Sequence, residues 1–348
     1  GTLITFGAIA AYGAVCVAAF SGARLWLPFV PVAMALVLVY LVVVVYRFMT
    51  EGQEAKRMKE MFSKYVTPSI VETLIQNPDM LKLGGERMDL TAMFALASGP
   101  GIHTDDAEIL VDRLNEYFTA MTEEIFRYDG TLDKYEGHII MAIYGAPVPF
   151  EDHPARACKS CVGMKKALEQ LKIEWKEKGL EPINVTVGLN SGPMIAGNMG
   201  SAARFSYTIM GDSVNLAARI LGAANQYGVA FMCSAMTYER AKDQITARLV
   251  DDIVVVGKTE PIKVYEIVGS PDIPPDEAML KCVEAYERGF KLYTERRWDE
   301  AMAAFDEALE HKPGDGPSKV LRARCEQYKS DPPGDGWQGE FKLTKKGL

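Results

Sequence analysis

The sequence predicts an α+β fold with a mixed sheet, preceded by two membrane-spanning helices and followed by a short helical segment. Three observations support this prediction. Two long segments near the start contain no charged residue, residues 86–269 alternate between strand-like and helical patterns, and residues 275–328 have helical periodicity. Hydrophobic residues make up 48% of the chain and charged residues 24%, which excludes a disordered or fibrous protein.

The length, charge and cysteine content of the chain further limit the class of protein to which it can belong. A chain of 348 residues predicts two or three folded units. The net charge of −8 argues against a general nucleic-acid binder, which would have a basic surface. The six cysteines are too scattered for a disulfide framework, so a reducing compartment is expected for most of the chain. Cys158 and Cys161 form a lone C-x-x-C, which predicts helix packing because no second ligand pair would complete a zinc site.

The two uncharged segments, residues 1–20 and 27–46, are each about the ~20 residues that cross the hydrocarbon core as a helix. The link between them is too short for a domain, so a transmembrane hairpin is predicted. The link contains one basic residue, Arg24, whereas four follow the second segment: Arg47, Lys56, Arg57 and Lys59. The positive-inside rule then places the rest of the chain in the cytoplasm. A signal peptide is the alternative, but two successive segments without a cleavage-like exit argue against it. Because the chain opens on Gly1 at the start of an apolar segment, we expect a piece of a longer protein whose sensor is missing.

A linker helix is predicted below the membrane. Its apolar residues recur at i, i+3, i+4 and i+7, a spacing that suits a parallel coiled coil in a dimer: Met58, Met61, Phe62 and Tyr65. Pro68 marks its end. The predicted boundaries are 1–48 for the two transmembrane helices, 49–67 for the linker helix, 68–270 for the α+β domain, 275–328 for the C-terminal helices and 329–348 for a flexible tail.

The α+β region is expected to contain strands at 90–96, 130–145 (two strands around a turn at Gly137) and 183–192, and helices at 109–128, 155–175 and 213–228. In the C-terminal segment, five residues match the spacing of one tetratricopeptide unit: Gly289, Ala301, Phe305, Ala308 and Pro313. Such arrays need about three repeats to bury their own faces, so a helical pair docked on the rest of the chain is expected.

Five segments resemble the successive signatures of class III adenylyl and guanylyl cyclase catalytic domains. They are MFSKYVTPSIVETL, LNEYFTAM, GTLDKYEGHIIMAIYGAP, VTVGLNSGPMIAGNMGS and RFSYTIMGDSVNLAAR. The resemblance covers residues 60 to 270 and implies a ferredoxin-like α+β core that works as a homodimer or heterodimer, with active sites at the interface. The membrane hairpin, linker helix and tetratricopeptide-like tail resemble bacterial receptor cyclases with an extracytoplasmic CHASE-type sensor. This implies a multi-pass protein of the bacterial inner membrane.

The family converts a nucleoside triphosphate to its 3′,5′-cyclic monophosphate and pyrophosphate. Two metal ions activate the attacking ribose oxygen and neutralise the leaving group. The family holds both ions with two aspartates, one at the end of the first strand and one in the following hairpin turn. The opposite protomer supplies an arginine for the charge on the α-phosphate, an asparagine for the ribose, and a lysine with an aspartate or threonine that select the purine.

Five residues match nucleotide-site positions of the family. Asn215 and Arg219 stand at i and i+4 on one helix, so both project from one face and match the transition-state pair. Lys134 and Thr208 match the purine-selecting pair, and this combination favours adenine and therefore ATP. Lys258 matches a lysine near the triphosphate, and a solvated lysine at a strand end is the alternative.

The metal positions differ from the family pattern, and no metal site is expected. Leu96 occupies the position of the first aspartate and His138 that of the second. Leucine cannot ligate a metal, and histidine suits zinc or copper better than magnesium and cannot bridge two ions. The loop after the first strand is altered by Ser98 and Pro100, and proline lacks the N–H that a phosphate loop uses.

Other carboxylates could replace the two lost metal ligands only if both had moved to new positions in the sequence, and the candidates are Glu136, Asp105 and Asp106.

Three hypotheses about the function follow. In the first, the chain is a dimerising subunit that acts either as a silent nucleotide sensor or by lending its half-site to an intact cyclase. In the second, it is an active adenylyl cyclase with a rearranged site that uses Mg²⁺ or Mn²⁺. In the third, it is a membrane-tethered interaction module without nucleotide chemistry. The first is preferred, because the chain keeps the purine and transition-state residues and lacks the metal ligands. In that case Mg²⁺ or Mn²⁺ would be held by the partner.

Overall fold

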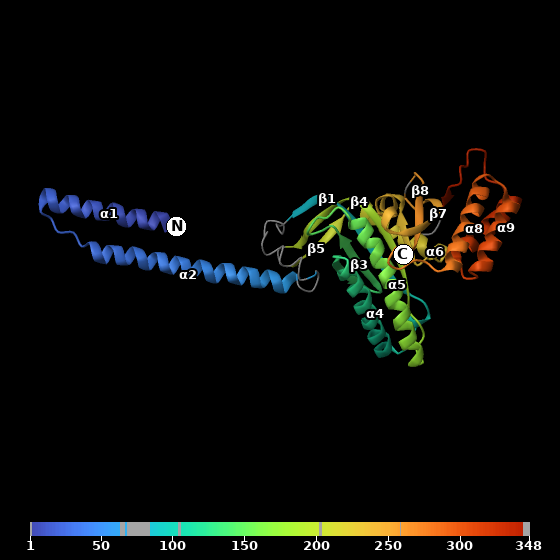
Figure 1. Ribbon diagram of the computed structural model, residues 1–348, viewed down its shortest axis with the longest axis horizontal. Coiled ribbons are helices and arrows are strands. Elements are labelled where there is room, and N and C mark those ends of the chain that lie inside the picture. Colours follow the sequence, from blue (N-terminus) through green and yellow to red (C-terminus); the bar gives the residue numbers. More distant parts are fainter. Residues whose placement is uncertain are drawn as a thin grey trace. The chain divides into compact units, whose positions relative to one another are not determined.

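The computed structural model describes residues 2–62, 67, 84–103, 106–201, 204–257 and 259–343 (Figure 1). The chain divides into two compact units, Gly1–Lys64 and Tyr65–Leu348.

The first unit is a pair of helices, α1 (Thr2–Ala23) and α2 (Phe29–Phe62). Both contain a stretch long and apolar enough to cross a membrane, Thr5–Ala23 and Phe29–Tyr46. No part of these stretches is buried inside the protein. α2 continues without a break beyond Tyr46 to Phe62, so the second apolar segment and the start of the predicted linker form one helix. The predicted coiled-coil stripe lies outside the residues whose side chains are described.

The second unit is built on one mixed sheet. Its elements are β1 (Gly84–Ser98), the 3-10 helix η2 (Pro100–Ile102), α4 (Ala107–Arg127), β2 (Thr131–Glu136), β3 (Ile139–Tyr144), α5 (His153–Glu177), β4 (Asn184–Ser201), β5 (Arg204–Met210), α6 (Asp212–Tyr227), β6 (Phe231–Ser234), α7 (Ala235–Ala241), the 3-10 helix η3 (Lys242–Gln244), β7 (Thr246–Val254), β8 (Ile262–Gly269), α8 (Glu277–Thr294), α9 (Trp298–His311), α10 (Gly316–Ser330) and β9 (Phe341–Lys342). The strand order is β2-β3-β1-β4-β6-β8-β7-β9, and β5 pairs with β4 outside this path. The β4–β6 and β7–β9 pairs are parallel and the others antiparallel, which confirms the α+β class with a mixed sheet.

Helices cover both faces of the sheet. α4 and α5 lie side by side against one face (Figure 1), where Met93, Ala95 and Ala97 of β1 enter the larger core. The alternate residues of β1, such as Leu90 and Ala92, face a second core that includes α6 residues. This alternation is the period of two that a strand buried on both faces requires.

β1 and β4 are longer than their apolar patterns predict. They pair antiparallel from Gly84↔Asn198 to Ser98↔Asn184, so the ladder extends well beyond the apolar residues 90–96. Backbone hydrogen bonding between two adjacent strands does not depend on apolar side chains, and the hydrophobic pattern therefore underestimates both strands.

The C-terminal segment consists of three helices, α8 to α10, where the sequence predicts a docked pair. Gly289 of α8 lies against the Phe305 ring of α9, since a Cβ at Gly289 would be 2.7 Å from that ring. Tyr286 and Phe305 belong to a buried cluster that also contains Val250 of β7 and Tyr227 of α6. The segment is thus packed onto the sheet, and its match to a tetratricopeptide unit stays a prediction.

The flexible tail predicted for 329–348 is wrong for residues up to 343. α10 extends to Ser330, Phe341 and Lys342 form β9 beside β7, and Leu343 is buried. The Trp337 ring packs against aromatic rings of the C-terminal helices, including Tyr293. The proline and glycine residues suggest a loose chain, but Trp337 and Phe341 bury enough apolar surface to fix this segment.

Cys158 and Cys161 confirm the packing prediction. Both thiols are buried in the core beneath α5, close to Cys233 of β6. A hydrogen bond to Cys233 and burial raise the pKa of the Cys158 thiol well above its ordinary value. The described cysteines are all free thiols.

Candidate nucleotide site

Lys134 of β2 and Thr208 of β5, the residues predicted to select the purine, contact each other although 74 residues separate them. Lys134 Nζ donates a hydrogen bond to Thr208 Oγ1 at 3.2 Å. The Thr208 hydroxyl in turn donates to Oδ2 of Asp133 at 2.5 Å, and Lys134 Nζ forms an ion pair with Asp133 Oδ1 at 3.2 Å. The structure therefore brings the predicted pair together and adds a carboxylate behind it.

Asp133 is a residue of this group that the sequence analysis missed. The pairing of β2 with β3 shifts between Leu132 and Lys134, so Asp133 is an extra residue in a β-bulge. Its side chain is buried, and burial raises the pKa of this carboxyl, which the hydrogen bond from Thr208 and the nearby Lys134 partly offset. The sequence signal was an acidic residue inside a short strand, directly before the matched lysine.

Asn215 and Arg219 lie one turn apart on α6. Asn215 is exposed, and Arg219 is half-buried. The guanidinium of Arg219 lies against Gly257, because a Cβ at Gly257 would be 3.4 Å from Arg219 Nη2. Its Nη1 is enclosed and has no hydrogen-bond partner among the described residues. A buried donor without a partner is unfavourable, and a bound anion such as a phosphate would satisfy it.

Lys258, predicted to lie near the triphosphate, falls outside the described residues. Its neighbour Gly257 is described and has φ of +81°, a conformation that favours glycine. In the described part of the chain, no hydrogen bond or ion pair joins the Lys134–Thr208 pair to Asn215 or Arg219.

Leu96 and His138 lie at the same end of the sheet. Leu96 of β1 is in register with Ile139 of β3, and the N–H of Ala97 donates to the carbonyl of His138 at 2.9 Å. The two positions predicted to replace the metal-binding aspartates are therefore adjacent. Here they contribute an aliphatic side chain and an imidazole, both half-buried.

The loop after β1 uses its own backbone donors. The N–H of Gly101 donates to the carbonyl of Pro182 at 3.0 Å, that of Ile102 to Gly99 at 3.3 Å, and that of His103 to Pro100 at 3.0 Å. A phosphate-holding loop needs such N–H groups free and aimed at the ligand. Across residues 99–103, these three donors are occupied.

The carboxylates considered as replacements do not gather at this place. Glu136 is the exposed last residue of β2. Asp106 caps α4, and its Oδ1 accepts from the N–H groups of Glu108 and Ile109 at 3.0 and 3.2 Å. Asp105 lies outside the described residues. Within the described ranges, no group of three or more His, Cys, Asp or Glu side chains is placed to hold a metal ion.

The described residues at the end of β1 and in the β2–β3 turn do not fit a pair of magnesium ions. Mg²⁺ needs hard oxygen ligands in near-octahedral geometry, and neither Leu96 nor His138 offers a carboxylate.

The mixed sheet with helices on both faces defines an α+β domain. Residues 91–269 match the family described as the adenylate and guanylate cyclase catalytic domain. The chain belongs to this family.

Three similar proteins illustrate the relationship. Adenylate cyclase 1 of Rhizobium meliloti is 27% identical over 215 residues, which cover 60% of this chain and 32% of that protein. The terminal-differentiation specific adenylate cyclase of Dictyostelium discoideum is 29% identical over 224 residues, covering 63% of this chain and 10% of that protein. The crystal structure of the adenylyl cyclase CyaB from P. aeruginosa is 31% identical, with a TM-score of 0.51, and covers 55% of this chain and 100% of that chain. The chain thus spans a third or less of the two curated relatives.

Proposed function

We propose that this chain is a membrane-anchored member of the cyclase family in cyclic-nucleotide signalling that lacks two-metal activity of its own. It acts as a dimerising regulatory or half-site-donating subunit. The observation that supports this proposal is the pairing of Leu96 with Ile139, the neighbour of His138, at one end of the sheet, while Lys134 and Thr208 remain in contact.

For the reaction rate, the loss of the metal ligands has a larger effect than the retention of the nucleotide-site residues. In a two-metal reaction the ions activate the nucleophile and stabilise the leaving group, and each contributes several kcal/mol. Every ~1.4 kcal/mol removed from transition-state stabilisation lowers the rate about tenfold. A self-paired dimer of this chain would lack both aspartates in both sites and would lose many orders of magnitude in rate.

The half-site that remains suits ATP. Lys134 and Thr208 can address the purine edge, and the guanidinium of Arg219 has an enclosed donor that a phosphate could accept from. Asn215 stands one turn before Arg219 and would position the ribose. In a heterodimer these four residues would complete a site whose metal ions are held by the aspartates of an intact cyclase. In a homodimer they would bind nucleotide without turnover.

Membrane anchoring is the part of the proposal supported by α1 and α2. Their apolar side chains are exposed and not packed into a core; Phe6, Val17 and Leu38 are 65%, 70% and 66% exposed. Such surfaces are stable against lipid chains and unfavourable in water. We place the second unit in the cytoplasm of a bacterial cell, beneath the inner membrane.

A complementation assay tests the proposal. The full chain is co-purified with a class III adenylyl cyclase that keeps its metal-binding aspartates. In this partner, the asparagine and arginine of the transition-state pair are replaced by alanine. The mixture is expected to form cyclic AMP with Mg²⁺ or Mn²⁺, and the chain with Arg219→Ala is expected not to support this activity. If the mixture forms no more cyclic AMP than the mutated partner alone, the half-site role is wrong.

The same measurement of cyclic AMP, made on the unmodified chain alone, tests the alternative of an active adenylate cyclase with a rearranged metal site. That alternative requires the chain alone to convert ATP to cyclic AMP and pyrophosphate, and it requires Arg219→Ala to abolish the turnover. Such a result would overturn the proposal.

A further inference from the structure

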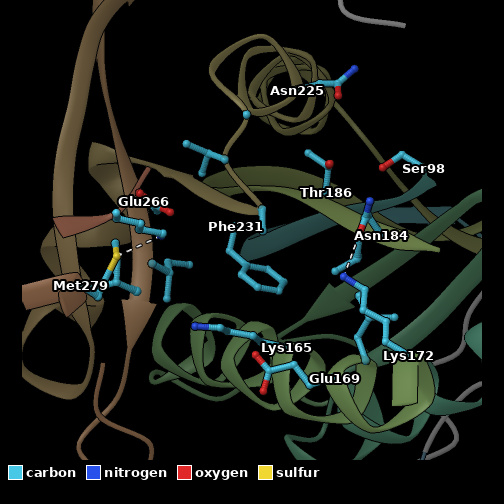
Figure 2. Close-up of a pocket in the computed structure, with 18 residues that line it drawn as sticks. Ser98, Lys165, Glu169, Lys172, Asn184, Thr186, Asn225, Phe231, Glu266 and Met279 are labelled. Atoms are coloured by element: carbon cyan, nitrogen blue, oxygen red, sulfur yellow. Dashed lines mark hydrogen bonds between the residues drawn. The ribbon is translucent and has the colours of Figure 1, made fainter. Parts of the chain in front are cut away.

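The second unit contains a cleft that is not lined by the predicted nucleotide-site residues Lys134, Thr208, Asn215 and Arg219. It has a volume of 410 Å³, is open on one side, and is lined by α5, the end of β1, the starts of β4 and β6, the end of α6, β8 and the C-terminal helices. Figure 2 shows Phe231 in the middle of the cleft, between Asn225 of α6 and the side chains of α5. A volume of a few hundred Å³ suits a small organic ligand.

Three lysines line this cleft. Lys165 and Lys172 lie two turns apart on α5, and Lys312 follows the end of α9. Lys172 Nζ donates to Asn184 Oδ1 at 2.6 Å, and burial lowers the pKa of its ammonium group. Lys165 is exposed and has no ion pair within the described ranges.

Two acidic residues also line the cleft, and they do not balance the lysines. Glu266 of β8 is already paired, because Arg248 Nε donates to its Oε2 at 2.7 Å. Only Glu169, on the same face of α5 as Lys165 and Lys172, remains to offset them. Two positive charges therefore lack a negative partner inside the cleft.

Neutral hydrogen-bonding groups complete the lining. They are the side chains of Ser98, Asn184, Thr186 and Asn225. Amide and hydroxyl groups can orient a carboxylate or a phosphate, and the ring of Phe231 provides an apolar floor beside them.

We propose that this cleft binds a small organic dianion, with carboxylate or phosphate groups between the lysines and an apolar portion against Phe231. The ligand would contact Asn225 in the last turn of α6, Ser98 two residues after Leu96, and Met279 of α8. Because Lys312 and Met279 belong to the C-terminal segment and the other residues to the sheet and its helices, a bound anion would tie that segment to the sheet. The site is independent of the proposed catalytic role.

Calorimetric titration of the full chain in detergent tests the proposal. The probes are malonate, citrate, inorganic phosphate and pyrophosphate, each compared with sodium chloride at equal ionic strength. We expect saturable binding of at least one probe, and a dissociation constant at least tenfold higher in Lys165→Gln and in Lys172→Gln. Preference for malonate and citrate would identify a carboxylate ligand, and preference for the two phosphates a phosphorylated one.

Lys176→Gln is the matched control, because Lys176 is an exposed lysine one turn further along α5 that does not line the cleft. Lys172→Gln removes one hydrogen bond, to Asn184, and Lys165→Gln removes no described contact, so both variants should fold. Absence of saturable binding for every probe would overturn the proposal. So would an equal loss in Lys176→Gln, or a loss in Lys134→Ala that is absent from Lys165→Gln.

Discussion

Arg248 of β7 and Asp315, the residue that caps α10, form a buried ion pair between the sheet and the C-terminal helices. Arg248 Nη2 lies 2.5 Å from Asp315 Oδ1, and Nη1 lies 3.2 Å from Oδ2. Asp315 Oδ2 also accepts from the N–H of Ser318 at 3.1 Å, which caps the helix. The Asp315 carboxylate thus caps the N-terminus of α10 and links this helix to β7 through Arg248.

Breaking this pair should strongly destabilise the second unit. The Arg248 and Asp315 side chains are 0% and 1% exposed, so Asp315→Ala would remove one of the two carboxylates that form ion pairs with this buried guanidinium and leave Glu266 as the other. Removing one partner of a buried pair costs about 3–5 kcal/mol. The expected result is a loss of that size in the free energy of unfolding, measured by urea denaturation.

Asp306→Ala is the control for this experiment, because Asp306 accepts from Arg322 Nε at 2.5 Å between exposed side chains of α9 and α10. Exposed pairs contribute less than about 1 kcal/mol. If the two variants were equally stable, the buried pair would not be what fixes α10 to the sheet.

The elements with a strong local pattern could be predicted from the sequence. α4, α5, α6 and the β2–β3 hairpin lie within a few residues of their expected bounds, because periodicity and turn residues act locally. The contact between Lys134 and Thr208 was expected only from the resemblance, since no local pattern links strands 74 residues apart.

Long-range burial could not be predicted. Asp133, Asp315 and Arg324 are charged residues that composition places at the surface, yet each is at least 95% buried with a partner from a distant element. Arg324 of α10 pairs with Asp251 of β7 at 2.6 Å. A charge is buried only where the fold supplies its partner, and that partner is not adjacent in sequence.

Restoring both aspartates should create activity in the chain itself. Leu96→Asp together with His138→Asp would place two carboxylates at adjacent positions on β1 and the β2–β3 turn. We expect cyclic AMP from ATP with Mg²⁺ or Mn²⁺ in the double variant, and at least a hundredfold less with either single change. Adding Arg219→Ala to the double variant should remove this activity. A folded double variant without activity would mean that the occupied N–H groups of the loop after β1 also prevent the reaction.

Nucleotide binding should depend on the Lys134–Thr208 pair. A non-hydrolysable ATP analogue is expected to raise the melting temperature of the full chain, because a ligand that binds only the folded state stabilises it. Lys134→Ala should abolish that rise, since the Nζ that contacts Thr208 and Asp133 is lost. Lys176→Ala, an exposed lysine on α5, is the control and should leave it unchanged. The absence of any rise in the unmodified chain would favour the hypothesis of an interaction module without nucleotide chemistry, and an unchanged rise in Lys134→Ala would show that nucleotide binding does not depend on this lysine.

His153, the first residue of α5, is the basis of a prediction about pH. Its ring is 2% exposed, and its Nδ1 lies 2.7 Å from Thr91 Oγ1. Arg240 Nη2 donates to Nε2 at 2.9 Å, so the neutral ring donates from Nδ1 to the threonine. Burial and the positive charge of Arg240 lower the pKa of His153 to about 4, although Asp89 and Asp152 act in the opposite direction.

Stability should therefore fall as the solution is acidified from pH ~6.5 to ~4. In the unfolded chain a histidine has a pKa of about 6.5, so it gains a proton in this range while the folded ring stays neutral. The contribution of the neutral His153 ring to the free energy of unfolding is complete above pH ~6.5 and is lost as the pH approaches 4. A difference of about 2.5 between the unfolded and folded pKa values corresponds to roughly 3 kcal/mol.

His153→Gln should lower stability at pH 7.5 and flatten the dependence of the free energy of unfolding on pH. His311→Gln, an exposed position at the end of α9, should keep the slope of the unmodified chain. Parallel curves for the unmodified chain and His153→Gln would show that this histidine does not titrate differently in the folded state.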